Sequence, residues 1–256
     1  MNRVIINSDD FASDKEVNQS ILSAFSQKLI SSSTALVNFS EGLEDAVQMV
    51  KANQIPKDAL GLHLNLTSGA PVLEETKSCG LICENGLFHG RIRTKPQFHI
   101  KLKDRQLIFN ELEAQLHRFN SQFGFMPSHI DGHEHVHTEW AIMRCVNQLA
   151  NENKITKIRI ARNLGENTSA LKSRYKSFFN WRLRQLGFIT TDFFGDFSDI
   201  EINNTHYTGK TVEIMVHAIP SINDDIVNDY NNVPLKDKVE KFRRNNNFDM
   251  INYSQL

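Results

Sequence analysis

Short apolar segments alternate with amphipathic ones along most of this chain, and this alternation restricts the possible fold more than any other feature. The run from Val4 to Asn7 is apolar and β-branched, as expected of a strand that is buried on both faces. Residues 15–28 instead carry apolar side chains at helical spacing, and Ser13 and Asp14 before them are suited to an N-cap. Buried strands that alternate with helices predict an α/β fold with parallel strands and outer helices.

The same order continues toward the C-terminus. We predict further strands at 34–38, 60–66, 128–131, 157–160 and 207–217, and further helices at 43–52, 105–123, 140–151 and 178–186. Residues 193–204 are polar and turn-prone, so no regular element is predicted there. About seven repeats in this length suit a single (β/α)-barrel domain over residues 1–256 better than an open sheet. The exception is residues 70–100, which we predict to be an insertion or hairpin over the barrel mouth.

Composition and charge exclude several classes of protein. A formal net charge of −1 provides no electrostatic attraction for nucleic acid or an anionic membrane. No stretch approaches the roughly 20 apolar residues of a membrane-spanning helix. The first strand is predicted to begin at Arg3, which leaves no room for a signal peptide, and three cysteines fit reduced thiols. We therefore expect a cytoplasmic protein, for which a homodimer would be a common assembly.

Four of the ten histidines lie within residues 128–140, at His129, His133, His135 and His137. Crowded imidazoles repel one another when protonated and are costly to bury unpaired, so the cluster indicates a shared task, most commonly metal binding. In an extended segment all four would share one side with Asp131. In a helix that starts near residue 132, His133 and His137 would share a face. His133 lies on the shared side in either geometry, so it is the first choice as a metal ligand.

The adjacent Asp9 and Asp10 follow the first predicted strand directly. In α/β barrels the C-terminal ends of the strands form the rim of the active site. Two neighbouring carboxylates repel each other, which raises the pKa of one unless a cation relieves the field. A metal on one aspartate and a free lone pair on the other would supply a ligand and a base. The alternative is a helix N-cap, but the position directly after a buried strand favours a functional site.

The predicted strand at 60–66 presents polar residues on one face. Leu62 and Leu64 point to one side, whereas His63 and Asn65 point to the other, toward the barrel interior. We favour His63 as a metal ligand over a hydrogen-bonded core histidine, and Asn65 as a neighbouring or substrate-contacting residue. One carboxylate with two imidazoles leaves positions open for water and substrate, as a catalytic site requires.

Further polar residues are expected at the rim. His217 ends a strand-like segment and is a candidate general acid for a leaving amine, with a satisfied core histidine as the alternative. Asp131 can orient a ligating imidazole through its second nitrogen. His135 and His137 are expected to support the ligands or contact substrate. Arg159, at another strand end, is expected to pair with the base or with the substrate.

Four segments, at residues 5–11, 33–38, 61–67 and 127–137, together with the strand that ends in His217, resemble the YdjC-like carbohydrate deacetylases. The similarity keeps the same order from the first residues to residues 251–253. The Asp-Asp-Phe and His-x-Asp-x-His-x-His-x-His elements are specific in combination. The resemblance implies a distorted (β/α) barrel related to polysaccharide deacetylases. It also implies metal-dependent hydrolysis of the acetamido group of N-acetylated mono- or oligosaccharides, such as chitooligosaccharides.

The resemblance makes Asp10, His63 and His133 the metal ligands, Asp9 the catalytic base and His217 the acid. One departure weakens the role of His217: family members usually carry Cys-His-Pro-Gly where this chain has Val-His-Ala-Ile at 216–219. Zn²⁺ suits two imidazoles by softness, whereas Mg²⁺ prefers oxygen ligands. Because the family is commonly described with Mg²⁺, we expect one divalent metal, Mg²⁺ or Zn²⁺.

In the expected mechanism, the metal polarises the acetyl carbonyl and binds the attacking water, from which Asp9 removes a proton. A backbone N–H near Asn65 or Thr67 is expected to help stabilise the oxyanion, and His217 protonates the departing amine. The rival reading is a metal-dependent phosphoesterase or cyclic amidohydrolase, which would favour two metals and an N-terminal His-x-His. A non-catalytic sugar- or metal-binding protein is the other alternative, and it would not need Asp9.

Overall fold

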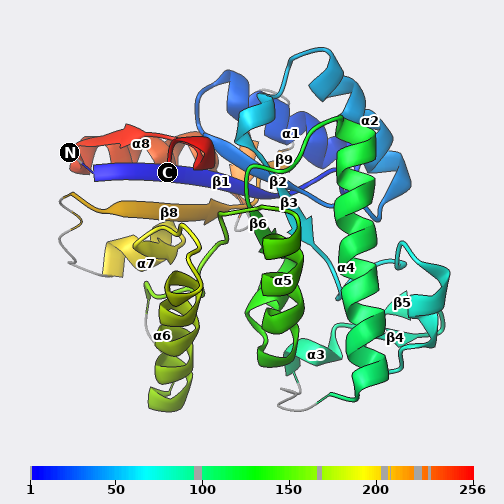
Figure 1. Ribbon diagram of the computed structural model, residues 1–256. Helices are drawn as coiled ribbons and strands as arrows, with labels where there is room; N and C mark the ends of the chain where they lie inside the picture. The colour runs from blue at the N-terminus through cyan, green and yellow to red at the C-terminus, as the bar shows by residue number, and fades with distance from the viewer. Residues whose placement is uncertain are drawn as a thin grey trace.

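A twisted parallel sheet occupies the centre of the structure, a computed structural model that describes residues 2–94, 100–165, 169–202, 207, 209–221, 227–229 and 232–256 (Figure 1). Its strands pair in the order β6-β3-β2-β1-β8-β7, and β12 pairs with the start of β1. All of these pairings are parallel. The strands are β1 (Asn2–Phe11), β2 (Ser32–Ala35), β3 (Leu60–Leu64), β6 (Ile130–Gly132), β7 (Phe193–Gly195), β8 (Thr211–Val216) and β12 (Phe248–Met250).

Two isolated bridges close the sheet into a barrel. Ile130 of β6 bridges to Ile158, and Lys157 bridges to Ile189 ahead of β7. The N–H of Arg159 also donates to the carbonyl oxygen of Ile130 at 3.0 Å. Since β7 pairs with β8 and β8 with β1, the pairings return to the first strand. The prediction of a distorted α/β barrel is therefore confirmed, although the segment around Ile158 takes part through bridges rather than as a full strand.

Helices cover the outside of the barrel in the order of the sequence. Helix α1 packs on α2, α2 on α4, and α4 on α5, and Figure 1 shows α4 and α5 on one side of the sheet. Asp14 caps α1 as predicted, because its carboxylate accepts the N–H of Val17 at 2.8 Å. The helices are α1 (Lys15–Ser26), α2 (Ser40–Lys51), α3 (Arg91–Thr94), α4 (Leu102–Phe123), α5 (Trp140–Glu152), α6 (Ala170–Gln185), α7 (Phe197–Ile202) and α8 (Leu235–Asn245).

The prediction that residues 193–204 lack regular structure is wrong, because β7 and α7 lie there. The polar residues that suggested a turn instead start the helix. Asp196 accepts the N–H of Asp199 at 3.0 Å, and the carboxylate of Asp199 accepts the N–H of Asp196 at 3.0 Å. Such reciprocal bonds satisfy the open N–H groups of a first helical turn. Residues 203 and 204 of this prediction lie outside the described residues, as does residue 208 of the predicted strand at 207–217.

The segment at 70–100 contains the predicted hairpin. It is formed by β4 (Cys83–Glu84) and β5 (Leu87–Phe88), which follow the 3-10 helix η2 (Glu74–Ser78). Asn85 and Gly86 connect the strands with φ of 53° and 80°, the left-handed pair that a two-residue hairpin turn requires. The N–H of Phe88 donates to the carbonyl of Gly69 at 2.8 Å, so the hairpin lies against the loop that follows β3. Residues 95–99 of the predicted insertion lie outside the described residues.

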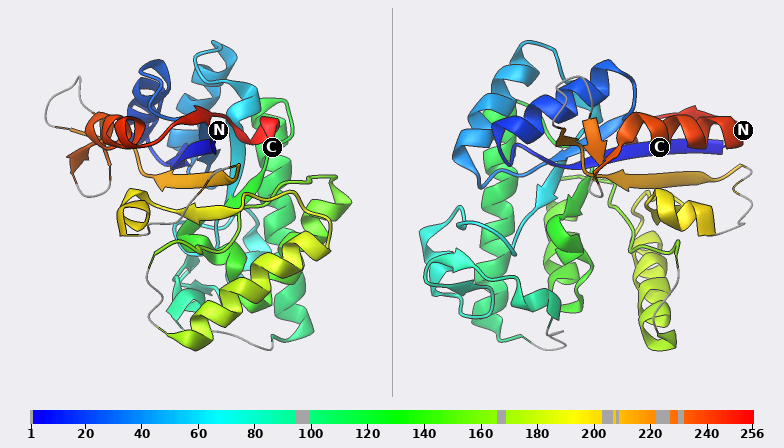
Figure 2. Two further views of the ribbon diagram at one scale, coloured as in Figure 1. Left: turned by 90° about the vertical axis from the view of Figure 1, so that its left-hand side faces the viewer. Right: turned by 180° about the vertical axis from the view of Figure 1, so that it is seen from behind.

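Both ends of the described chain lie at the same side of the barrel. Figure 2 shows the two ends close together, and Asn2 pairs with Phe248 in the β1–β12 ladder. The remaining elements are the 3-10 helices η1 (Lys57–Ala59), η3 (His133–Thr138) and η4 (Tyr253–Gln255), and an antiparallel sheet of β9 (Ile219–Pro220), β10 (Val227–Asp229) and β11 (Val233–Pro234). Within the described part of the chain, every helix is too short or too polar to cross a membrane.

Candidate functional site

A break in the regular alternation of β1 brings two consecutive aspartates to the end of the strand. In an undistorted strand, Asp9 and Asp10 would point to opposite faces. Asp10 instead has a φ of 70°, and the pairing of β1 with β2 shifts register between Ser8 and Phe11. Aspartate adopts this left-handed conformation more readily than most residues. Asp9 is therefore buried inside the barrel, whereas Asp10 is partly exposed at its rim.

Three imidazoles surround the carboxylate of Asp10. Nδ1 of His133 lies 3.0 Å from Oδ1 of Asp10, and Nε2 of His63 lies 3.4 Å from the same oxygen. Nε2 of His217 lies 3.9 Å from Oδ2. These residues stand at or just beyond the C-terminal ends of β1, β3, β6 and β8, where the sequence predicted a site. The structure thus brings the predicted ligands and the predicted acid together.

The donor set fits a divalent cation. Asp10, His63 and His133 each offer one ligand atom, and these atoms all lie within 4.8 Å of one another. One carboxylate oxygen and two imidazole nitrogens are the ligands that Zn²⁺ prefers, and three protein ligands leave positions open. The proximity agrees with the sequence analysis, and ligation itself stays a prediction.

The electrostatics of the rim favour a cation beside Asp10. Burial alone would raise the pKa of Asp10, but hydrogen bonds from His133 and His63 hold it well below its usual range. Burial alone would lower the pKa of His63, but Asp131, Asp9 and Asp10 outweigh this effect and raise it to about 10. Ring nitrogens that attract a proton this strongly lie in a negative field that also attracts a metal ion.

Asp9 forms a buried ion pair with Arg159. Nη2 of Arg159 donates to Oδ1 of Asp9 at 2.7 Å, and Nη1 donates to Oδ2 at 2.9 Å. Asn7 also donates to Oδ1, at 2.9 Å. Burial alone would raise the pKa of Asp9, but the charge of Arg159 outweighs it and lowers the pKa well below the usual range. Asp9 is therefore an ionised acceptor, and Asp14 rather than Asp9 caps the following helix.

Asp131 orients His63, as the sequence analysis expected. Its Oδ1 lies 2.7 Å from Nδ1 of His63, which leaves Nε2 of that ring facing Asp10. Its Oδ2 lies 2.6 Å from Nη1 of Arg159 and accepts a hydrogen bond from Thr34 at 3.1 Å. Asp9, His63 and Asp131 form a second group of close ligand atoms. Because the guanidinium already neutralises these carboxylates, a second cation would be redundant there.

Arg159 contacts a third carboxylate that the sequence analysis missed. Its Nε donates to Oε1 of Glu213 at 2.7 Å, and the hydroxyl of Tyr253 donates to Oε2 of Glu213. All three residues are fully buried, and burial raises the pKa of Glu213 to about 7. The guanidinium also lies over the ring of Phe194, 4.8 Å from its centroid. The sequence does contain one indication of this contact: Glu213 is a charged residue inside the apolar strand β8, where a buried carboxylate needs a partner.

His135 and His137 lie apart from the ligand atoms. The segment η3 is neither extended nor a continuous helix, because φ is 58° at His135, so both predicted geometries are wrong. The ring of His135 packs edge-on against Phe194 at 5.6 Å, and that of His137 packs against Phe179 at 6.3 Å. Neither histidine belongs to the groups of close ligand atoms found among the described residues.

Asn65 organises the loop after β3. Its Oδ1 accepts the N–H of Thr67 at 3.0 Å, and its amide donates to the carbonyl of Ser68 at 2.8 Å. Its own N–H donates to Oε1 of Gln115 at 2.9 Å. The N–H groups of Asn65 and Thr67 thus already have acceptors, and the expected contribution of a backbone N–H near them to an oxyanion stays a prediction.

The backbone of His217 is fixed from the outer sheet. Its N–H donates to Oδ1 of Asp229 at 2.8 Å, and Lys238 donates to the other oxygen of Asp229 at 2.7 Å. The next N–H, that of Ala218, donates to the hydroxyl of Ser8 at 3.1 Å. These bonds hold the start of the loop after β8 beside the end of β1, which keeps the imidazole near Asp10.

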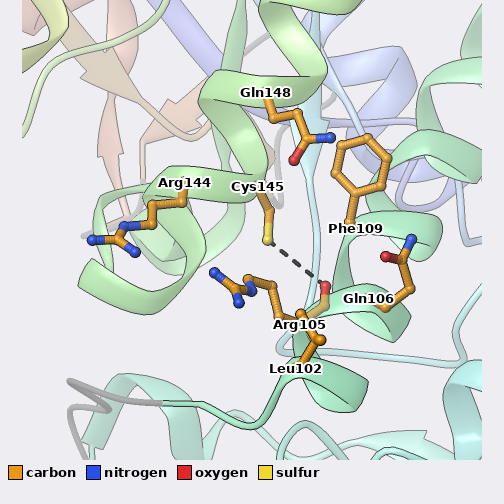
Figure 3. A pocket seen from close by; sticks show the side chains of 7 residues that line it. All are labelled: Leu102, Arg105, Gln106, Phe109, Arg144, Cys145 and Gln148. Atoms are coloured by element: carbon orange, nitrogen blue, oxygen red, sulfur yellow. Dashed lines mark hydrogen bonds between the residues drawn. The ribbon is translucent and has the colours of Figure 1, made fainter.

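A pocket lies elsewhere, between α4 and α5 (Figure 3). Inside it, Sγ of Cys145 lies 3.8 Å from the carbonyl oxygen of Arg105. The lining residues are Leu102, Arg105, Gln106, Phe109, Arg144, Cys145 and Gln148. None of these seven residues was predicted for the site, and the charged rim around Asp10 is separate from them. The three cysteines, including Cys145, are buried free thiols.

Residues 3–253 match the model of a family described as YdjC-like protein. The chain is 31% identical over 230 residues to a chitooligosaccharide deacetylase of Citrobacter koseri, which covers 88% of this chain and 83% of that protein. It is 32% identical over 158 residues to a carbohydrate deacetylase of Danio rerio, where the match covers 62% of this chain and 49% of that protein. The chain thus spans about half the length of the Danio rerio relative.

Other comparisons agree with these matches. A carbohydrate deacetylase of Brevibacillus brevis is 38% identical over 153 residues, which cover 60% of this chain and 57% of that protein. A solved structure from Enterococcus faecalis V583, described as a candidate cellobiose-phosphate cleavage protein, superposes with a TM-score of 0.70 at 21% identity. That superposition covers 99% of this chain and 98% of the other, so the two chains share a fold over almost their whole lengths.

Proposed function

The chain belongs to the YdjC-like family, and from this membership and the geometry of the rim we propose that it is a metal-dependent carbohydrate deacetylase. The proposed reaction is hydrolysis of the acetamido group of an N-acetylated sugar, which yields acetate and a free amino sugar. The observation that carries the proposal is the convergence of Asp10, His63 and His133 beside an ionised Asp9.

Asp10, His63 and His133 are the proposed metal ligands. When bound there, a divalent cation such as Zn²⁺ or Mg²⁺ polarises the acetyl carbonyl and lowers the pKa of water. Asp131 contributes by holding Nδ1 of His63, so that Nε2 of the ring faces the rim. A histidine fixed through its second nitrogen is a stronger and better oriented ligand.

Asp9 is the proposed base. It is ionised because of Arg159, and a carboxylate oxygen has two lone pairs, so an oxygen that accepts from the guanidinium can still take a proton from water. Only 3% of Asp9 is exposed, so this proton must arrive from the rim, where the neighbouring Asp10 lies. The register shift in β1 supports this proposal, because it leaves Asp9 directly behind the proposed ligand Asp10.

His217 is the proposed acid. Its Nε2 approaches Oδ2 of Asp10, whereas His63 and His133 approach Oδ1, so it stands on the other side of that carboxylate. From this side a protonated imidazole can transfer its proton to a departing amine.

The substrate is proposed to be an N-acetylated mono- or oligosaccharide, such as a chitooligosaccharide, from the names of the relatives. We further propose that residues 1–256 form one catalytic domain and that the insertion at 70–100 selects the sugar. Gly90 of this insertion lies near Glu134, because a Cβ on Gly90 would be 3.9 Å from a carboxylate oxygen of Glu134. Glu134 follows the proposed ligand His133, so the insertion borders the rim.

The deciding experiment measures acetate released from N,N′-diacetylchitobiose. Protein treated with a chelator is expected to lose this activity and to recover it when Zn²⁺ or Mg²⁺ is restored. Full activity in the chelator, with metal content shown to be zero, would contradict a metal-dependent mechanism. Sugar binding without acetate release in the metal-loaded protein would favour a non-catalytic sugar-binding role.

A further inference from the structure

The C-terminal turn, residues 252–256, closes the end of the barrel opposite the rim. Within it, the side-chain amide of Asn252 and the hydroxyl of Ser254 both donate to Oδ2 of Asp58, at 3.1 and 3.2 Å. Asp58 belongs to η1, which leads into β3. These bonds tie the turn to the barrel and place the side chain of Tyr253 inside it, where it is fully buried.

The ring of Tyr253 is fixed by stacking on His129. The two ring centroids lie 3.6 Å apart with planes 7° from parallel. Burial holds the pKa of His129 well below its usual range, so the ring is neutral. Gly61 makes room for this stack, because a Cβ there would lie 2.4 Å from Cε1 of His129. A ring held in this way directs its hydroxyl to one acceptor, Oε2 of Glu213.

Hydrogen bonds then connect the C-terminal turn to the proposed base. Glu213 accepts from Tyr253 on one oxygen and from Nε of Arg159 on the other. The terminal nitrogens of the same guanidinium bind Asp9 and Asp131. The line Tyr253–Glu213–Arg159–Asp9 therefore runs through the barrel interior from its closed end to the rim.

We propose that Tyr253 and Glu213 are positioning residues for the deacetylation, because they hold Arg159 in the orientation in which it binds Asp9. This inference rests on the proposed function, in which Asp9 is the base. A guanidinium is a planar fork, so rotating it would break its paired bonds to Asp9. The bond from Nε to Glu213 prevents that rotation.

The test compares kcat and KM of Y253F and E213Q with those of the wild type on N,N′-diacetylchitobiose. Y253F keeps the stacked ring and removes only the hydroxyl. We expect kcat to fall about tenfold in Y253F and further in E213Q, with KM changed by less than about twofold. The control S121A removes an exposed hydroxyl of α4 that donates to the carbonyl oxygen of Arg118, and it should leave both kcat and KM unchanged.

A second measurement does not depend on catalysis. The ¹⁵N resonance of Nε–H in Arg159 reports its bond to Glu213, and we expect it to shift in Y253F and E213Q but not in S121A. A folded Y253F with unchanged kcat would overturn the inference. If the wild type releases no acetate from any sugar, the proposed function fails. A shifted resonance would then show that the pair orients Arg159 without any role in deacetylation.

Discussion

Arg159 binds both carboxylate oxygens of Asp9 with its two terminal nitrogens, at 2.7 and 2.9 Å, in a part of the barrel where neither side chain exposes more than 4% of its surface. Removing one member of such a buried pair leaves a charge without compensation, which costs far more than the pair itself contributes. Changes at either residue should therefore preserve shape and, where possible, charge.

Replacing Asp9 with Asn should abolish turnover while the protein keeps its metal. The amide cannot accept the proton of water, so we expect kcat to fall by about a thousandfold or more. Acetate release and metal analysis of the same sample measure the two effects. The control D192N changes an aspartate that pairs with Lys210 at the surface and should change neither. Loss of metal together with activity would mean that the roles of Asp9 and Asp10 are reversed.

Arg159→Lys should destabilise the fold although it keeps the charge. One ammonium cannot bind Asp9, Asp131 and Glu213 in the fixed fork that the guanidinium provides, so the free energy of unfolding should fall by about 3 kcal/mol. Urea denaturation measures this change. The matched control is R162K, because Arg162 pairs with Asp196 and with both oxygens of Asp199, but its side chain is 31% exposed. We expect R162K to lower the free energy of unfolding by about 1 kcal/mol or less.

If R159K and R162K lowered the free energy of unfolding by the same amount, the buried guanidinium of Arg159 would have no special role in stability. Activity gives a further check, since R159K should also lower kcat, whereas R162K should leave it unchanged.

Gly61→Ala should destabilise the barrel through His129. The added Cβ would lie 2.4 Å from a ring atom of His129, which is stacked on Tyr253 and has no space to move. We expect the free energy of unfolding to fall by about 2–3 kcal/mol, which is in the range measured for overpacked cores. The control G80A meets no atom within 4 Å and should be close to neutral. Thermal unfolding of both variants measures the difference, and an equal Tm would contradict the tight packing.

The stability of the wild type should fall as pH rises from about 4.5 to about 7. Burial raises the pKa of Glu213 from 4.5 to about 7, so over this window the folded protein holds a proton that the unfolded chain has lost. The contribution is complete below the lower pKa and disappears as pH passes the upper one. This change in the free energy of unfolding is roughly 3 kcal/mol. Denaturation curves of E213Q should lack this dependence, and an identical pH dependence in both proteins would contradict it.

Local patterns were sufficient to predict most of the barrel. Apolar periodicity is a property of neighbouring residues, so it located α1, α2, α4, α5 and most strands to within a few residues. It placed the start of α6 eight residues too late and did not predict α7 or α8. The rim followed from topology, because parallel strands carry their C-terminal ends to one side, and this placed Asp10, His63, His133 and His217 together.

Contacts between distant segments could not be predicted in this way. The hydroxyl of Tyr253 meets Glu213 only because β12 returns to pair with β1, and no local pattern records that return. Left-handed backbone at His135 likewise broke the expected geometry of the histidine cluster. At 196–199, polar residues that are typical of turns form the start of a helix. The same side chains can accept backbone N–H groups in a turn or at a helix N-terminus, so the sequence does not distinguish the two.

The left-handed residue at the end of β1 makes the length of that strand matter as much as its composition. Because Asp10 has a φ of 70°, Asp9 and Asp10 both lie at the same end of the barrel, Asp9 inside it and Asp10 at its edge. Inserting or deleting one residue before Asp9 would exchange the faces of the pair without changing a single side chain. An alanine at position 10 would also strain the backbone, so asparagine, which tolerates this conformation, is the cleaner probe of ligation.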